Sequence, residues 1–110
     1  MQISKEVLID VSADASNSSG VQTDGLLLSG IVFPAAMTGA NVTFDFSYDG
    51  TNWKDVVETD NTEVTYVVSA DNVVRVDPSG WAFATAGFLR VTSDGTEAAD
   101  RQINLIFKSS

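Results

Sequence analysis

Residues 41–53, NVTFDFSYDGTNW, constrain the fold of this chain more than any other stretch. Val42, Phe44, Phe46 and Tyr48 alternate there with polar residues. A β-strand sends successive side chains to opposite faces, so the alternation predicts a strand with one buried apolar face and one solvated face.

The end of this stretch predicts a hairpin. Asp49 followed by Gly50 is typical of a tight turn, because glycine tolerates positive φ and aspartate hydrogen-bonds to backbone amides two residues on. Trp53 opens the returning strand, and we expect its indole to fold into the core.

Short apolar segments recur along the rest of the chain, with turn residues every 8–12 positions. This spacing predicts an all-β protein, an antiparallel β-sandwich with the jelly-roll arrangement as its finer form. The expected strands number about eight and lie within residues 2–11, 25–33, 41–48, 53–57, 63–69, 73–76, 87–93 and 102–107. The side chains expected in the core are Val42, Phe44, Phe46, Trp53, Tyr66, Leu89, Ile103 and Leu105.

Three further segments have local signals of their own. Residues 25–33 form a nearly continuous apolar run that suits a central strand, and Gly30 within it indicates a bulge or a close backbone approach. Residues 79–85 carry Trp81 and Phe83 and are expected to plug one end of the core as a loop or a short helix. Residues 12–23 are small and polar, which predicts an irregular connection or arm.

We therefore expect one domain, divided into an N-terminal strand and arm over residues 1–24 and a β-sandwich over residues 25–110. The Ser/Ala/Asn-rich half of the first part lacks an apolar pattern, so it is expected to order on contact with a partner.

Charge and composition exclude several classes of function. The chain has 15 acidic and 6 basic residues, a net charge of −9, which repels phosphate backbones and anionic lipids. We therefore expect neither a nucleic acid nor a membrane as partner. Cysteine and histidine are absent, which excludes disulfides, Cys/His zinc sites and imidazole bases. Lys5 and Glu6 stand where a signal peptide needs apolar residues, so secretion is not expected.

No residue is predicted to be catalytic, to bind a cofactor or to ligate a metal. Residues 45–50 resemble the first half of a calcium loop, but Val56 stands where the loop needs its last carboxylate. The carboxylates at positions 55, 58, 60 and 63 offer an acid and a base without any nucleophile–base pair. We expect them to solvate the surface, and we do not expect an enzyme.

Two sets of side chains leave alternatives open. Trp53 and Trp81 suit stacking on a sugar ring if they are exposed, and core packing if they are buried. The arginines Arg75, Arg90 and Arg101 suit ion pairs with neighbouring strands or contact with an acidic partner.

Several motifs, in this order, resemble small β-sandwich proteins of tailed bacteriophages and prophages, found as head decoration proteins or other minor virion components. The motifs are GLLLSGIVFPA (25–35), VTF (42–44), SYDGTNW (47–53), VRVDP (74–78), GFLRVTS (87–93) and DRQINL (100–105). The resemblance implies a decoration or cement protein that binds the major capsid protein or another virion protein. It also implies a homo-oligomer, with a trimer as the expected number, and location in the virion after synthesis in the host cytoplasm. Head or tail is left open.

The SYDGTNW hairpin and the later strand with Arg90 are also similar to discoidin-type carbohydrate-binding modules. Those modules are usually longer and carry cysteines, and their sugar-binding residues do not align onto this chain. The alternative function is therefore a carbohydrate-binding β-sandwich module or an adhesin component of a tail or fibre.

Overall fold

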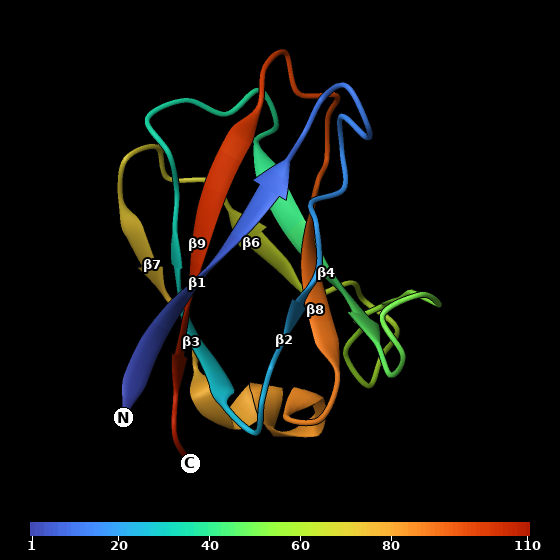
Figure 1. Ribbon diagram of the computed structural model, residues 1–110, viewed down its shortest axis with the longest axis vertical. Helices are drawn as coiled ribbons and strands as arrows, with labels where there is room; N and C mark the ends of the chain where they lie inside the picture. Colours follow the sequence, from blue (N-terminus) through green and yellow to red (C-terminus); the bar gives the residue numbers. More distant parts are fainter.

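Two antiparallel β-sheets face each other in the computed structural model, which describes residues 1–110 (Figure 1). The first sheet has the order β1 (Gln2–Ile9), β9 (Arg101–Lys108), β3 (Leu27–Val32) and β7 (Val73–Arg75). The second has the order β2 (Val21–Gln22), β8 (Phe88–Ser93), β4 (Asn41–Ser47) and β5 (Lys54–Asp55), and β6 (Thr65–Val67) also pairs with β4. The predicted β-sandwich is confirmed.

The chain passes repeatedly from one sheet to the other, since β1, β3, β7 and β9 belong to the first and the intervening strands to the second. This order is compatible with a jelly roll, which stays a prediction. None of the helices is long and apolar enough to cross a lipid bilayer.

The longest pairing joins the two ends of the chain. All eight residues of β1 pair in register with β9, from Gln2 opposite Lys108 to Ile9 opposite Arg101, so both termini lie at one end of the sandwich (Figure 1). Val7 and Ile9 are fully buried and alternate with exposed residues. The first strand is therefore part of the first sheet.

Strand β3 occupies the interior of the first sheet, between β9 and β7, and carries the predicted bulge. Its register on β9 shifts between Leu28 and Gly30, and the hydroxyl of the extra residue, Ser29, donates to the carbonyl of Ile106 at 3.2 Å. A Cβ on Gly30 would lie 3.3 Å from the Ile106 side chain, so a small residue suits this position.

Residues 12–23, expected as a free arm, are folded onto the edge of the second sheet. Asn17 forms a β-bridge with Thr92, the amide of Ser18 donates to the carbonyl of Val91 at 2.8 Å, and β2 pairs with β8. Ser18 is almost completely buried. This polar segment packs without an apolar pattern because its backbone and hydroxyl groups find hydrogen-bond partners on β8.

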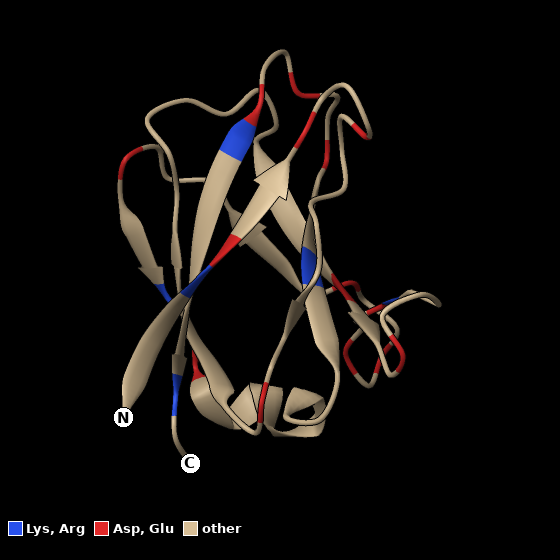
Figure 2. Cartoon of the chain, in the orientation of Figure 1, with Lys and Arg blue, Asp and Glu red and all other residues tan.

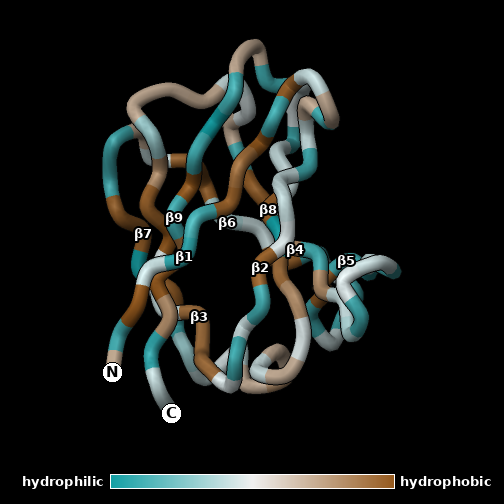
Figure 3. The backbone as a smooth tube through the Cα atoms, in the orientation of Figure 1, coloured by the Kyte–Doolittle hydropathy of each residue, from teal (hydrophilic) through white to brown (hydrophobic).

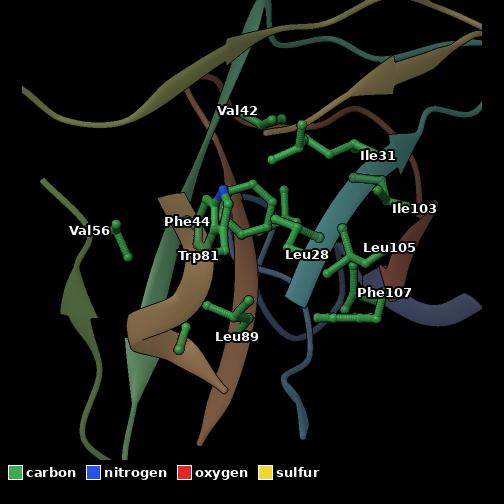
Figure 4. Packing of buried hydrophobic residues seen from close by; sticks show 14 of the residues in the cluster. Leu28, Ile31, Val42, Phe44, Val56, Trp81, Leu89, Ile103, Leu105 and Phe107 are labelled. Carbon is green, nitrogen blue, oxygen red and sulfur yellow. The ribbon is translucent and has the colours of Figure 1, made fainter. Parts of the chain in front are cut away.

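A 3₁₀-helix, η1 (Pro78–Ala84), closes the end of the sandwich nearest the termini (Figure 1). Asp77 caps it by accepting from the Ser79 amide, and Pro78 occupies the first turn. Trp81 is only 3% exposed and packs on Phe44, with ring centroids 4.9 Å apart (Figure 4). The predicted plug is confirmed for Trp81, whereas Phe83 points outward.

The core contains seventeen buried apolar residues from both sheets and η1. Five of the eight predicted core side chains are 0–1% exposed: Val42, Phe44, Leu89, Ile103 and Leu105. Phe46 and Tyr66 are half-buried at the margin of this cluster. The predictions for the remaining residue, Trp53, and for the far end of β4 were wrong.

Strand β4 changes character halfway along. Val42 and Phe44 are fully buried, but Tyr48 on the same face is 79% exposed because the β4–β5 hairpin projects from the sandwich (Figures 1 and 3). On the reverse face, expected to be wet, Asp45 and Ser47 are buried.

Trp53 covers that reverse face. Asp55 pairs with Asp45, and Trp53 lies two residues before Asp55, so its side chain points to the same, outer face of the second sheet. There the guanidinium of Arg90 lies 4.6 Å from the Trp53 ring centroid and its Nε donates to Asp45 at 2.9 Å. The indole is half-buried over this ion pair.

Substitution of Phe44 tests the core assignment. Phe44→Ala should lower the free energy of unfolding by about 3–5 kcal/mol, because a fully buried ring is removed and leaves a cavity. Tyr48→Ala is the matched control, since Tyr48 lies on the same face of the same strand and is exposed; its effect should stay within about 0.5 kcal/mol. Urea unfolding of both variants measures the difference. Equal midpoints would show that the register of β4 is wrong.

Candidate functional site

Two exposed aromatic side chains, Tyr48 and Phe83, lie where β4, β5 and η1 meet. Two adjoining hollows of about 290 and 280 Å³ share Val56, Val57 and Phe83 in their walls. We call the pair the aromatic groove. Phe83 is 54% exposed and Val57 is 47% exposed, and apolar side chains that lie together on a protein surface often mark a binding site.

The groove is connected to the core by a continuous series of aromatic contacts. Six rings follow one another with centroid distances of 4.9–5.9 Å, in the order Tyr66, Phe44, Trp81, Phe83, Phe46 and Tyr48. Four of the five contacts are edge-on. Phe44 is fully buried and anchors the series, so the exposed rings at its other end are held in place before any ligand binds.

The first hollow combines aromatic walls with polar groups. The indole Nε1 of Trp81 donates to the Tyr66 hydroxyl at 3.1 Å, which leaves the hydroxyl proton available to an acceptor from outside. Glu58 and Asp77 also line this hollow. Burial raises the pKa of Tyr66 and the two carboxylates raise it further, while the Trp81 hydrogen bond opposes them. The hydroxyl is therefore neutral and lies in a negative potential.

The second hollow lies beside the projecting hairpin and is lined by Phe46, Tyr48, Lys54 and Asp55 together with the shared wall. Lys54 is the one cation among the groove residues, against three carboxylates from the two hollows. Further acidic residues lie on the projecting β4–β5 hairpin and in the loop that follows β5 (Figure 2). The groove is thus apolar in its walls and acidic at its rim.

Asp49 lies in the turn between β4 and β5, and its carboxylate is hydrogen-bonded within that turn. Asp49 accepts hydrogen bonds from the amides of Thr51 and Asn52 at 2.9 Å and from the Asn52 side chain at 2.8 Å, and Gly50 has the positive φ of 81° that the turn requires. These hydrogen bonds hold the pKa of Asp49 far below its usual range. The resemblance to a calcium loop is thereby explained as turn chemistry.

The two tryptophans and two of the three arginines have structural partners. Trp81 is buried, and Trp53 has Arg90 over its ring and Gly20 beside it, where a Cβ would lie 2.7 Å from the indole. Arg90 pairs with Asp45 and Arg101 pairs with Glu97, whereas Arg75 forms no ion pair.

Four acidic residues were expected to lie close together at one hairpin end, and in the structure each has a different environment. They are Asp55, Glu58, Asp60 and Glu63. Glu58 lines the first hollow and Asp55 the second. Asp60 accepts from the Thr62 amide at 3.0 Å, which lowers its pKa and shapes the turn. Glu63 bridges to Val57 through the backbone.

The exposed rings of Tyr48 and Phe83 were not singled out as binding residues from the sequence. A signal for Phe83 was present, since Trp81 and Phe83 are two residues apart in a 3₁₀-helix with three residues per turn. Side chains at that spacing point in different directions, so both rings cannot enter the core. Nothing in the alternation of β4 marks the point at which the opposite sheet stops covering it.

A second polar cluster lies at the opposite end of the sandwich and is centred on Glu97. Its carboxylate is 0% exposed and accepts from the amides of Thr38 and Gly39, from the Ser93 hydroxyl and from Nε of Arg101, at 2.7–2.8 Å. A Cβ on Gly39 would collide with the Ser93 hydroxyl. Every acceptor position faces a donor of the protein itself, so this cluster ties two loops together and is not open to a ligand.

Comparison of the chain with protein-family models, with curated proteins and with solved structures found no match.

The Glu97 cluster predicts how stability depends on pH. Burial alone would raise the pKa of Glu97, but the hydrogen bonds from Thr38, Arg101, Gly39 and Ser93 outweigh it and lower the pKa from 4.5 to about 2. A depressed folded-state pKa stabilises the protein above the unfolded value, and that stability is lost as the pH falls from about 4.5 to about 2. The full contribution is about 3 kcal/mol.

Glu97→Gln should therefore unfold more easily at neutral pH and show a flatter pH profile below pH 4.5, the ordinary value for this group. Denaturant unfolding at several pH values measures this. Glu6→Gln, on the exposed face of β1, is the matched control and should resemble the unaltered protein. A pH profile of Glu97→Gln that matches this control would contradict the assignment.

Proposed function

We propose that this chain is a non-enzymatic structural protein of a tailed-phage virion, a decoration protein that binds the major capsid protein and stabilises the head. The observation that carries the proposal is the aromatic groove, an exposed apolar surface held rigid from the core outward. Exposed aromatic residues in fixed positions are typical centres of protein–protein interfaces. The kind of partner follows from the resemblance of the strand and turn motifs to small virion sandwich proteins.

The manner of attachment differs from the expected ordering of an N-terminal arm. Residues 1–24 supply β1 and β2, and the segment between them is bonded to β8, so removing them would expose both sheets. The proposed attachment surface is instead the aromatic groove at the η1 end. This surface is already folded in the free protein, so binding costs little ordering entropy.

Substitution of Phe83 tests the proposal. Phe83→Asp places a charge in the shared wall of the groove and should weaken binding to capsid particles roughly 30-fold, the effect of losing a central interface residue. Particles assembled from the major capsid protein of the same phage, without the decoration protein, are incubated with each variant and sedimented. Leu8→Asp, on an exposed position of β1, is the control and should bind normally. Normal occupancy by Phe83→Asp, or no occupancy by the unaltered protein, would sink the proposal.

The homo-oligomer implied by the resemblance would need a contact surface on another side of the molecule. Strands β6 and β7 are edge strands of the two sheets, and they expose Val67 (71%) and Val73 (57%). Unpaired edge strands with apolar side chains tend to pair with another chain. We propose that copies meet through this edge as a trimer, either in solution or on the capsid.

The molecular mass of the protein in solution tests the proposed trimer. Light scattering of the purified protein should give three times the mass of one chain, and Val67→Lys should reduce it to one. If the free protein has the mass of one chain, images of decorated particles should show three copies around each threefold position. Isolated single copies on the particle would contradict the trimer.

A carbohydrate-binding module or a tail or fibre adhesin is the second candidate, and one observation favours it. The Tyr48 ring is 79% exposed beside Phe46, at a centroid distance of 5.7 Å, and offers a face on which a sugar ring can stack. A glycan array distinguishes the two functions, because a decoration protein should give a blank array and a sugar-binding module should give saturable signal that Tyr48→Ala removes.

A further inference from the structure

We propose that the aromatic groove binds a short protein segment in which a lysine or arginine stands next to apolar side chains. This inference rests on the proposed function, since it names the chemistry of the partner surface that the groove receives.

The walls of the first hollow fit a cation with a long apolar stem. Phe83, which is 54% exposed, and the half-buried Tyr66 supply the accessible rings of its lining, while Trp81 is buried and packs against Phe83 from the core side, with the ring centroids 5.7 Å apart. Ammonium and guanidinium groups bind over the faces of such rings, and their methylene stems cover apolar surface. The volume of about 290 Å³ is at the lower end for ligand pockets, which suits one side chain better than a larger ligand.

The rim supplies the countercharges. Glu58 and Asp77 line the first hollow, and neither forms an ion pair within the protein. One oxygen of Asp77 accepts both hydrogen bonds from Ser79, so the other oxygen remains available. A bound guanidinium or ammonium would complete charge-assisted hydrogen bonds with these carboxylates.

The second hollow would hold the apolar side chain that stands next to the lysine or arginine of the bound segment. It adjoins the first across Val57 and Phe83, and its other walls include Phe46 and Tyr48. An apolar side chain placed there would cover rings that are now exposed to water. A segment with a cation and an apolar side chain close together therefore fills both hollows at once, and the Tyr66 hydroxyl is free to donate to one of its carbonyl groups.

The negative charge of the groove and of the whole chain favours a cationic protein segment over a second copy of the chain, an anionic ligand or a neutral sugar. A second copy of the chain would bring another net charge of −9 and the same acidic rim, so groove-to-groove pairing is opposed by repulsion. Anionic ligands are opposed for the same reason. A neutral sugar would stack on the rings but would leave the carboxylates of Glu58 and Asp77 without a countercharge.

Peptide titration of the intact, isotope-labelled protein tests the inference by nuclear magnetic resonance. The probe is acetyl-Leu-Arg-Leu-amide, with acetyl-Leu-Gln-Leu-amide and acetyl-Leu-Glu-Leu-amide as matched peptides. We expect saturable shifts of the Val57, Glu58, Tyr66 and Phe83 amides with the arginine peptide. Binding should weaken at high ionic strength, should be about tenfold weaker with glutamine and should be absent with glutamate.

Two variants test whether the carboxylates of Glu58 and Asp77 contact the cation of the peptide. Glu58→Gln should weaken binding of the arginine peptide about tenfold, as expected for the loss of a charge-assisted contact, whereas Glu6→Gln removes the same charge from the exposed face of β1 and should leave binding unchanged. Asp77→Asn should act like Glu58→Gln while preserving the cap of η1, because asparagine is also a good N-cap residue. Equal effects of Glu58→Gln and Glu6→Gln would show that net charge alone is responsible and would overturn the inference.

Four other results would also overturn it. Equal shifts with the arginine and glutamate peptides, or none in the groove, would exclude a cationic occupant. Shifts with maltohexaose but not with the arginine peptide would assign the groove to sugar. Concentration-dependent shifts of the same amides without peptide would assign it to a second copy. If the protein binds capsid particles but not the arginine peptide, the proposed function stands and only this inference fails.

Discussion

The contact between Trp81 and Phe44 determines much of the structure around it. It joins η1, which belongs to neither sheet, to the centre of β4, with the rings edge-on at a centroid distance of 4.9 Å (Figure 4). Because Trp81 enters the core, Phe83 must leave it, and Phe83 becomes the wall between the two hollows. The same buried contact thus closes the sandwich and orients the exposed ring.

The opposite end of the molecule is stabilised by different chemistry. There the loops meet around Glu97, whose four hydrogen bonds come from two backbone amides, one hydroxyl and Arg101. A buried carboxylate is tolerated only when its hydrogen bonds are complete, so these loops have little freedom to rearrange. The aromatic end, in contrast, keeps carboxylates and rings in contact with solvent. The two ends of the sandwich therefore differ, one closed by a complete set of hydrogen bonds and the other open and apolar.

The sequence predicted those features that depend on neighbours along the chain. The alternation of β4 placed Val42 and Phe44 in the core, and Gly30 marked the bulge of β3. The sequence-based prediction failed where the burial of a side chain depends on whether the opposite sheet covers it. Tyr48 continues the same alternation into solvent, and the groove that includes it was not foreseen.

Hairpin register and hydrogen bonding explain the other two differences. The side on which Trp53 lies depends on the pairing of Asp45 with Asp55, which the turn residues alone do not fix. Residues 12–23 look like an arm because they lack an apolar pattern, but their packing uses hydroxyl and amide groups. Polar partners on β8 cannot be recognised from an apolar pattern.

The net charge of −9 is distributed unevenly, because most of the acidic residues have no basic partner within the chain. Lys5, Arg90 and Arg101 are paired with Asp24, Asp45 and Glu97, so half of the six basic residues form ion pairs within the chain. The remaining cations are few and separated, whereas most of the unpaired acidic residues lie in loops, with Glu6 on β1 and Asp55 on β5 as exceptions (Figure 2). A partner that approaches either end meets negative potential, and a basic partner surface is drawn in faster at low ionic strength. In the proposed complex, the apolar rings of the groove would determine which of the two ends holds the partner, because the Glu97 end has no comparable exposed aromatic surface to bury.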